Sequence, residues 1–154
     1  MEECTLILDN IRSVANVGSI FRTADCLGVS KLILIGTTPT PLDRFGRKRK
    51  DFIKVSLGAE EFVRWEYSEN ISPVLNQLKK EKMKIVALEQ AKGSKDLKNY
   101  KAPNKFALIV GNEVTGIPRK VLGKCDVVVE IPMKGKKESM NVAVSAGIAL
   151  FNLL

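Results

Sequence analysis

Short apolar segments rich in β-branched residues alternate along this chain with stretches in which apolar residues recur every three or four positions. The first pattern is typical of strands buried on both faces, and the second of helices with one buried face. Five segments are predicted to be buried strands: residues 5–8, 31–35, 84–88, 106–110 and 127–131. Residues 62–67 alternate apolar and polar side chains, which indicates a strand at the edge of a sheet.

The second pattern predicts three helices: residues 17–27, which stop before Gly28, residues 71–81 and residues 141–154. Strands that alternate with helices predict an α/β domain in which helices flank a mostly parallel sheet. The length of 154 residues is that of one domain. Residues 36–58 show no clear pattern, and so long an irregular segment predicts a functional loop.

The chain contains no histidine, which excludes Ser-His-Asp triads, Cys-His dyads and the helical zinc motif of metalloproteases. Cys4, Cys26 and Cys125 are scattered and lack C-x-x-C spacing. We therefore expect reduced thiols, packed as small apolar residues, in a cytoplasmic protein without a metal site. No apolar run reaches the ~20 residues that cross a bilayer, and the first residues do not resemble a secretion signal.

The formal net charge is +8, and part of it falls in two basic clusters. The first comprises Arg44, Arg47, Lys48, Arg49 and Lys50, and the second Lys134, Lys136 and Lys137. Such clusters neutralise phosphates and favour binding of RNA or DNA. One alternative is a solvated lysine-rich surface. Another is contact with an anionic membrane surface, which is weaker because neither cluster lies on a predicted amphipathic helix.

Polar loops follow three of the predicted strands, and open parallel sheets bind ligands beyond the carboxyl ends of their strands. Gly111 and Gly116 have the spacing of a phosphate-binding P-loop, but Ile117 and Pro118 replace its Lys and Ser/Thr. No G-x-G-x-x-G follows a strand, which disfavours a dinucleotide site. The two glycines can equally be ordinary turn residues.

Other polar residues near these loops also have ordinary interpretations when each is taken alone. Asn16 and Ser139 have residue types that cap helices. Glu113 is either solvated or fixes a loop by accepting hydrogen bonds from backbone N–H groups. Their combination is more specific than any one of them.

Three segments together resemble the motifs of the SpoU-type RNA 2′-O-ribose methyltransferases of the SPOUT superfamily. They are NVGSIFRTA (residues 16–24), IVGNEVTGI (residues 109–117), and IPMKG followed by SMNVAVSAG (residues 131–135 and 139–147). The motifs come in the expected order and span nearly the whole chain. TPTP (residues 38–41) and KVSLGA (residues 54–59) are a softer match to the TrmH-like, tRNA-modifying branch.

The resemblance implies a deep C-terminal trefoil knot, a homodimer and S-adenosylmethionine as the cofactor. It also implies that six residues line the cofactor pocket: Leu88, Gly111, Asn112, Ile131, Met133 and Met140. Apolar side chains can enclose an adenine ring while backbone groups at strand ends read its edge. Gly111 is expected to leave room for the ligand.

The resemblance puts Arg22 at the centre of methyl transfer to a ribose hydroxyl. A guanidinium has a pKa above about 12, so we expect Arg22 to fix the ribose and stabilise the developing alkoxide rather than act as a base. Asn16, Ser139 and Asn141 are expected to orient substrate and loops. Glu113 is expected to do the same and is a weak candidate for proton acceptor.

The chain starts almost at its first strand, so we expect a single domain over residues 1–154 with no separate RNA-binding extension. RNA contact is then expected from the loop that carries Arg44–Lys50, with tRNA favoured over rRNA. Three alternatives stay open: an rRNA 2′-O-methyltransferase, a non-catalytic RNA-binding protein with a methyltransferase-like fold, and a different nucleotide-binding α/β protein.

Overall fold

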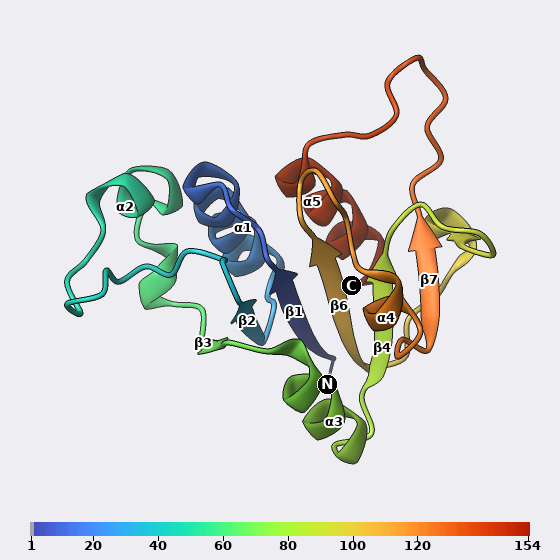
Figure 1. The fold of residues 1–154 in the computed structure, drawn as a ribbon, viewed down its shortest axis with the longest axis horizontal. Coiled ribbons are helices and arrows are strands. Elements are labelled where there is room, and N and C mark those ends of the chain that lie inside the picture. Colours follow the sequence, from blue (N-terminus) through green and yellow to red (C-terminus); the bar gives the residue numbers. More distant parts are fainter. Residues whose placement is uncertain (1) are drawn as a thin grey trace.

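The computed structural model describes residues 2–154 and contains one seven-stranded sheet, in which every pair of neighbouring strands is parallel (Figure 1). The strands are β1 (Glu3–Asp9), β2 (Lys31–Ile35), β3 (Trp65–Ser68), β4 (Lys84–Leu88), β5 (Lys95–Asp96), β6 (Lys105–Gly111) and β7 (Val127–Glu130). Their order across the sheet is β3-β2-β1-β6-β4-β7-β5. The central strands are fully buried over most of their length, as their uninterrupted apolar sequences predict.

Helices cover both faces of the sheet. They are α1 (Val14–Leu27), α2 (Lys50–Ser56), α3 (Ile71–Lys80), α4 (Arg119–Leu122) and α5 (Val142–Leu153), with two short 3-10 helices, η1 (Ala59–Glu61) and η2 (Leu97–Asn99). Buried residues of α1, α2 and α5 share one apolar core, in which the rings of Phe21 and Phe52 meet edge to face at 5.1 Å. Residues of α3 and α4 form a second core on the opposite face. This arrangement confirms the predicted α/β fold.

The strand register brings several strand ends to one edge of the sheet. Asp9 aligns with Gly111 across β1 and β6, and Leu88 aligns with Val129 across β4 and β7. Because all these strands are parallel, the loops that follow them emerge side by side. The loop between β7 and α5 extends well away from the rest of the domain (Figure 1).

Neither Asn16 nor Ser139 caps a helix, although both have residue types that can. The first helix begins at Val14, three residues before the predicted start, and the hydroxyl of Ser13 accepts the N–H of Asn16. Asn16 therefore lies inside α1 rather than at its cap. The last helix is capped by Asn141 rather than Ser139, since the Asn141 side chain accepts the N–H groups of Ala143 and Val144. These caps free Asn16 and Ser139 for other contacts.

The segment 36–58 is less irregular than its sequence predicts. It contains α2, a seven-residue helix that buries only Phe52 and Ser56. A helix of two turns with two buried residues does not generate a helical repeat that can be recognised in a sequence. The edge strand predicted at residues 62–67 is confirmed as β3, which begins three residues later and pairs with β2 alone.

The cysteines match their predicted environment only in part. All three are free thiols, and burial raises the pKa of Cys4 to about 12 and that of Cys125 to about 11. Cys26 is exposed on α1, so the prediction that it packs as an apolar residue is wrong. Among residues 2–154, no helix is long and apolar enough to cross a membrane.

The C-terminal helix packs against α1 and also reaches η2. Within this packing, the side chain of Asn152 donates a hydrogen bond to the backbone carbonyl of Leu97 at 2.9 Å. This contact joins the end of the chain to the segment between β5 and β6. The trefoil knot that the family resemblance implies at this end of the chain stays a prediction.

Candidate functional site

A cavity of about 1210 Å³ opens at the carboxyl ends of β4, β6 and β7, where three loops and the start of α5 meet. Its lining includes ten residues predicted for cofactor binding or catalysis: Asn16, Leu88, Gly111, Asn112, Glu113, Ile131, Met133, Ser139, Met140 and Asn141. Arg22, the remaining predicted catalytic residue, lies elsewhere. The structure therefore brings the three distant motif segments together at one cavity, and Arg22 is the only predicted catalytic or cofactor-binding residue that does not line it.

Asn16 joins these segments through its side chain. Its Oδ1 accepts a hydrogen bond from Nδ2 of Asn141 at 3.0 Å, and its own Nδ2 donates to Oε2 of Glu113 at 3.3 Å. Asn16 comes from α1, Glu113 from the loop after β6 and Asn141 from the cap of α5. One amide thus fixes the relative positions of three walls of the site.

Glu113 holds the loop after β6 against the start of α1. Its two carboxylate oxygens accept the backbone N–H groups of Arg12 at 3.1 Å and Ser13 at 3.0 Å. Partial burial acts to raise the pKa of Glu113, but the hydrogen bonds from Arg12, Ser13, Asn16 and its own backbone outweigh burial and lower it. An ionised carboxylate with both oxygens engaged fixes a loop, one of the two roles the sequence left open, and is poorly placed to accept a proton.

Asn112 shapes the same loop from within. Its Nδ2 donates to the backbone carbonyl of Asn10 at 2.8 Å, while its Oδ1 accepts the N–H groups of Val114 and Thr115 at 2.8 and 3.0 Å. Every polar atom of its side chain is therefore used to build the loop.

Gly111 was expected to leave room for the ligand, but the structure shows a different reason for glycine at this position. A β-carbon at this position would lie 2.7 Å from the backbone of Gly116 and of Ile117. The space beside Gly111 is therefore filled by the returning loop of the protein itself and is not room for a ligand. Gly111 still lines the cavity through its backbone.

Glu89 is a site residue that the sequence analysis did not select. Its Oε2 accepts the backbone N–H of Ile117 at 2.8 Å and would lie 2.2 Å from a β-carbon at Gly116, whose φ of 68° also favours glycine. Gln90 follows and donates to the backbone carbonyl of Glu138 at 2.7 Å. Both residues come directly after a predicted strand, which is the signal that could have identified them.

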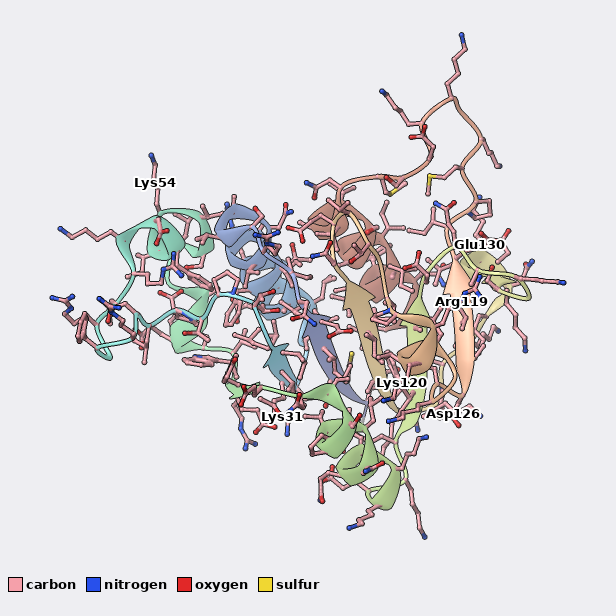
Figure 2. The ribbon with its side chains drawn as sticks, viewed as in Figure 1. Lys31, Lys54, Arg119, Lys120, Asp126 and Glu130 are labelled. Carbon is pink, nitrogen blue, oxygen red and sulfur yellow. The ribbon has the colours of Figure 1, made fainter. Side chains whose placement is uncertain are left out.

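The cavity walls combine apolar side chains with a few charges. The half-buried side chains of Leu88, Ile131, Met133 and Met140 supply the apolar surface. Arg119, at the start of α4, and Glu130, at the end of β7, also line this cavity and bring one charge of each sign to it. Figure 2 labels both residues. Apolar walls with backbone groups and opposite charges suit a ligand that has both a ring and charged ends.

Arg22 lies on an exposed stretch of α1, outside the cavity. It lines a shallower hollow together with Ser19, Cys26 and Phe151, at the contact between α1 and α5. Its position beside Ser19 and Cys26 and away from the buried face of α1 confirms the helical spacing predicted from the sequence. Within one chain, Arg22 and the cavity are on neighbouring surfaces.

The first basic cluster is less positive than its sequence suggests. Arg47 pairs with Asp43 at 3.1 Å, Lys48 with Glu61 at 2.9 Å and Arg49 with Asp51 at 2.8 Å. Among the ion pairs of residues 2–154, none involves Arg44 or Lys50. Lys50 lies in the first turn of α2, and Figure 2 shows Lys54 of the same helix pointing into solvent.

The second basic cluster lies on the extended loop between β7 and α5. Lys134, Lys136 and Lys137 are all exposed there, within the segment that also supplies Met133 and Met140 to the cavity. A phosphate-rich ligand can contact these lysines while its other end lies in the cavity that Met133 and Met140 line.

In the part of the chain that the structure describes, no group of three or more acidic or cysteine side chains could hold a metal ion.

Residues 3–151 match the SpoU rRNA Methylase family. The chain belongs to this family. A similar SpoU-family relative is the 23S rRNA (guanosine-2′-O-)-methyltransferase RlmB of Neisseria meningitidis, 37% identical over 145 residues, which are 94% of this chain and 55% of that protein. The chain thus spans just over half the length of the curated relatives it matches.

Two solved SpoU-family structures share the fold closely. An AdoMet-bound rRNA methyltransferase from Sinorhizobium meliloti has a TM-score of 0.85 and 27% identity, over 97% of this chain and 55% of that one. A TrmH/SpoU tRNA modifying enzyme from A. aeolicus has a TM-score of 0.84 and 28% identity, over 99% of this chain and 74% of that one. The similarity covers nearly the whole chain in both cases.

Proposed function

We propose that this protein is an S-adenosylmethionine-dependent methyltransferase that modifies a ribose 2′-hydroxyl of RNA. The observation that carries the proposal is the bridge from Asn16 to both Glu113 and Asn141, which joins the three family segments around one cavity. Family membership and the AdoMet-bound relative from S. meliloti support the choice of reaction and cofactor.

The cavity fits S-adenosylmethionine in the chemistry of its walls. The apolar side chains of Leu88, Ile131, Met133 and Met140 suit the adenine ring and the aliphatic part of the cofactor. The backbone of Gly111 and Asn112, at the end of β6, supplies hydrogen-bonding groups. When bound, the cofactor supplies an activated methyl group.

Arg22 is proposed to act on the RNA rather than on the cofactor. Its guanidinium is a permanent donor that can hold a ribose or an adjacent phosphate and stabilise the negative charge that develops on the 2′-oxygen. Its location outside the cavity supports this division of roles. Asn16, Ser139 and Asn141 then orient the loops between Arg22 and the cofactor site.

A homodimer through α1 and α5 is the proposed assembly. Val144, Ile148 and Phe151 of α5 are exposed apolar residues, and Phe151 is 79% exposed. They line a hollow of about 810 Å³ that continues into the cavity at Asn16 and Asn141. A second copy on this face would cover the apolar surface and close the site beside Arg22. Sedimentation of Phe151→Glu, expected to be monomeric where the native protein is dimeric, tests this assembly.

A tRNA is the proposed substrate, and an rRNA is the alternative. The A. aeolicus structure is that of a tRNA modifying enzyme, which supports the first, whereas the N. meningitidis relative methylates 23S rRNA, which supports the second. Arg44 and Lys50 on the first basic cluster and the lysines between β7 and α5 are proposed to contact the RNA backbone. An RNA substrate and three free thiols support a cytoplasmic location.

Incubation with methyl-labelled S-adenosylmethionine and total RNA tests the proposed activity. The expected result is label in RNA, at nucleotides whose 3′-phosphodiester bond resists alkaline cleavage because the 2′-oxygen is methylated, with tRNA labelled in preference to rRNA. Label confined to rRNA would show that rRNA, and not tRNA, is the substrate, and would leave the proposed methyl-transfer reaction unchanged. RNA binding without any transfer would instead identify a non-catalytic RNA-binding member of the family.

A further inference from the structure

Residues 42–48, here called the basic turn, form a tight and well-braced structure on the side of the sheet that carries α2 and β2 (Figure 1). Leu42 and Lys48 pair across its base as an antiparallel bridge. Asp43 braces the interior, because its Oδ1 accepts the N–H groups of Phe45 at 2.8 Å and Arg47 at 2.9 Å. The backbone at the tip is therefore fixed before any ligand arrives.

The basic turn presents one aromatic side chain to solvent. Phe45 is 65% exposed, and its ring has the guanidinium of Arg44 at 4.8 Å and that of Arg47 at 5.0 Å from its centre. These are the cation–π contacts found among residues 2–154. Phe62 is also exposed, at 78%, but no guanidinium lies over its ring.

An exposed phenylalanine ring between two guanidiniums suits a ligand that has both a flat aromatic group and a phosphate. The ring offers a flat apolar face, on which a nucleobase stacks regardless of its sequence. The guanidiniums offer forked donors that match phosphate oxygens. An exposed cation–π contact is weaker than base stacking combined with a phosphate contact, so a nucleotide can displace a guanidinium from the ring. Bases within a duplex are already stacked, so the complement is an unpaired nucleotide.

We propose that Phe45 is a stacking platform for an unpaired base of the RNA substrate, with Arg44, whose guanidinium is in none of the ion pairs of residues 2–154, contacting a phosphate beside it. This rests on the proposed function only in taking RNA as the substrate. The strand order separates the basic turn, beside β2, from the cavity at β4, β6 and β7. Phe45 therefore contacts an unpaired nucleotide of the RNA outside the cofactor cavity.

The test compares binding of a single-stranded RNA and of a blunt duplex of the same sequence, each measured by anisotropy at several salt concentrations. Phe45→Ala is expected to weaken single-strand binding roughly five- to hundredfold, to change duplex binding less than about twofold, and to leave the salt slope unchanged. Phe45→Trp is expected to retain single-strand affinity. Phe62→Ala is the matched control and is expected to bind like the native protein.

Arg44→Ala separates the phosphate contact from stacking. It is expected to weaken binding of both RNAs and to lower the salt slope by roughly 0.7–0.9. Native-like single-strand binding by Phe45→Ala would overturn the inference, as would equal losses on single strand and duplex, or an equal loss in Phe62→Ala. Methyl transfer by the native protein, measured alongside, distinguishes the outcomes. Transfer that persists with no Phe45 effect refutes the platform alone, whereas a native protein that neither binds nor methylates RNA refutes the proposed function.

Discussion

The side-chain amide of Asn141 donates a hydrogen bond to Oδ1 of Asn16 at 3.0 Å, across 125 positions of sequence. The oxygen of the same Asn141 side chain caps α5 by accepting the N–H groups of Ala143 and Val144. One residue thus starts the last helix and attaches it to the first. Because Asn16 also contacts Glu113, the position of α5 is coupled to the loop after β6.

Two substitutions at Asn141 are expected to separate its capping role from its bridging role. Asn141→Ala removes both and should lower the unfolding free energy by about 1 kcal/mol from the lost cap alone. Asn141→Asp keeps the capping oxygen but loses the donor to Asn16, so stability should be nearly native while cofactor affinity falls. Thermal unfolding and cofactor titration of both variants measure this, and native cofactor affinity in Asn141→Asp would show that the bridge does not shape the site.

A methyl group at Gly111 is expected to disrupt the loop after β6. Gly111→Ala places a β-carbon 2.7 Å from backbone atoms of Gly116 and Ile117, which cannot move without distorting the loop. We expect a loss of roughly 1–3 kcal/mol of stability and a loss of cofactor binding. Gly135→Ala is the control, since no atom lies within 4 Å of its β-carbon. Equal melting temperatures for the two variants would contradict the packing described for Gly111.

The low pKa of Glu113 predicts how stability depends on pH. A carboxyl whose pKa is lower in the folded than in the unfolded state stabilises the fold above the unfolded pKa, and this contribution is lost as pH falls through the folded pKa. The native protein should therefore lose more stability than Glu113→Gln between about pH 5 and pH 3. Denaturant unfolding at several pH values measures the difference, and parallel pH profiles would show that Glu113 is not clamped by hydrogen bonds.

The ion pairs within the first basic cluster predict unequal effects of neutralising its members. Arg44→Ala and Lys50→Ala should each lower the salt slope of RNA binding by roughly 0.7–0.9, because neither side chain is engaged by a carboxylate. Lys48→Ala should have a smaller effect, since Lys48 already pairs with Glu61 at 2.9 Å. Equal slopes for all three variants and the native protein would remove this loop from the RNA-binding surface.

The sequence predicted the sheet well because its central strands are buried on both faces. Residues 31–35 and 84–88 are recovered as β2 and β4 with the same bounds, since an uninterrupted apolar segment has few alternatives in a parallel sheet. The helix α2 could not be predicted in this way, because Phe52 and Ser56 are its only buried residues. A helix or strand can be predicted from the local sequence pattern only where buried residues recur regularly along it.

The residues of the candidate site were predicted from the motif resemblance, but the hydrogen bonds and packing contacts that hold them together were not. Periodicity alone could not place Asn16 against Asn141, because long-range contacts depend on how distant strands are ordered. Gly111 was expected to leave room for a ligand, but the chain turns back within six residues and fills that space with Gly116 and Ile117. Residue types alone do not show how closely such a loop returns to the strand that precedes it. Glu89 was missed because its contact with Ile117 joins loops after two different strands.

The cavity at β4, β6 and β7 is proposed to hold the cofactor, while Arg22 is proposed to act on the RNA from outside it. Calorimetric titration of S-adenosylmethionine into the native protein and into Arg22→Ala tests both parts together. We expect one cofactor to bind per chain with nearly the same affinity in both proteins, although Arg22→Ala should no longer methylate RNA. Absence of binding to the native protein, or loss of binding in Arg22→Ala, would contradict it.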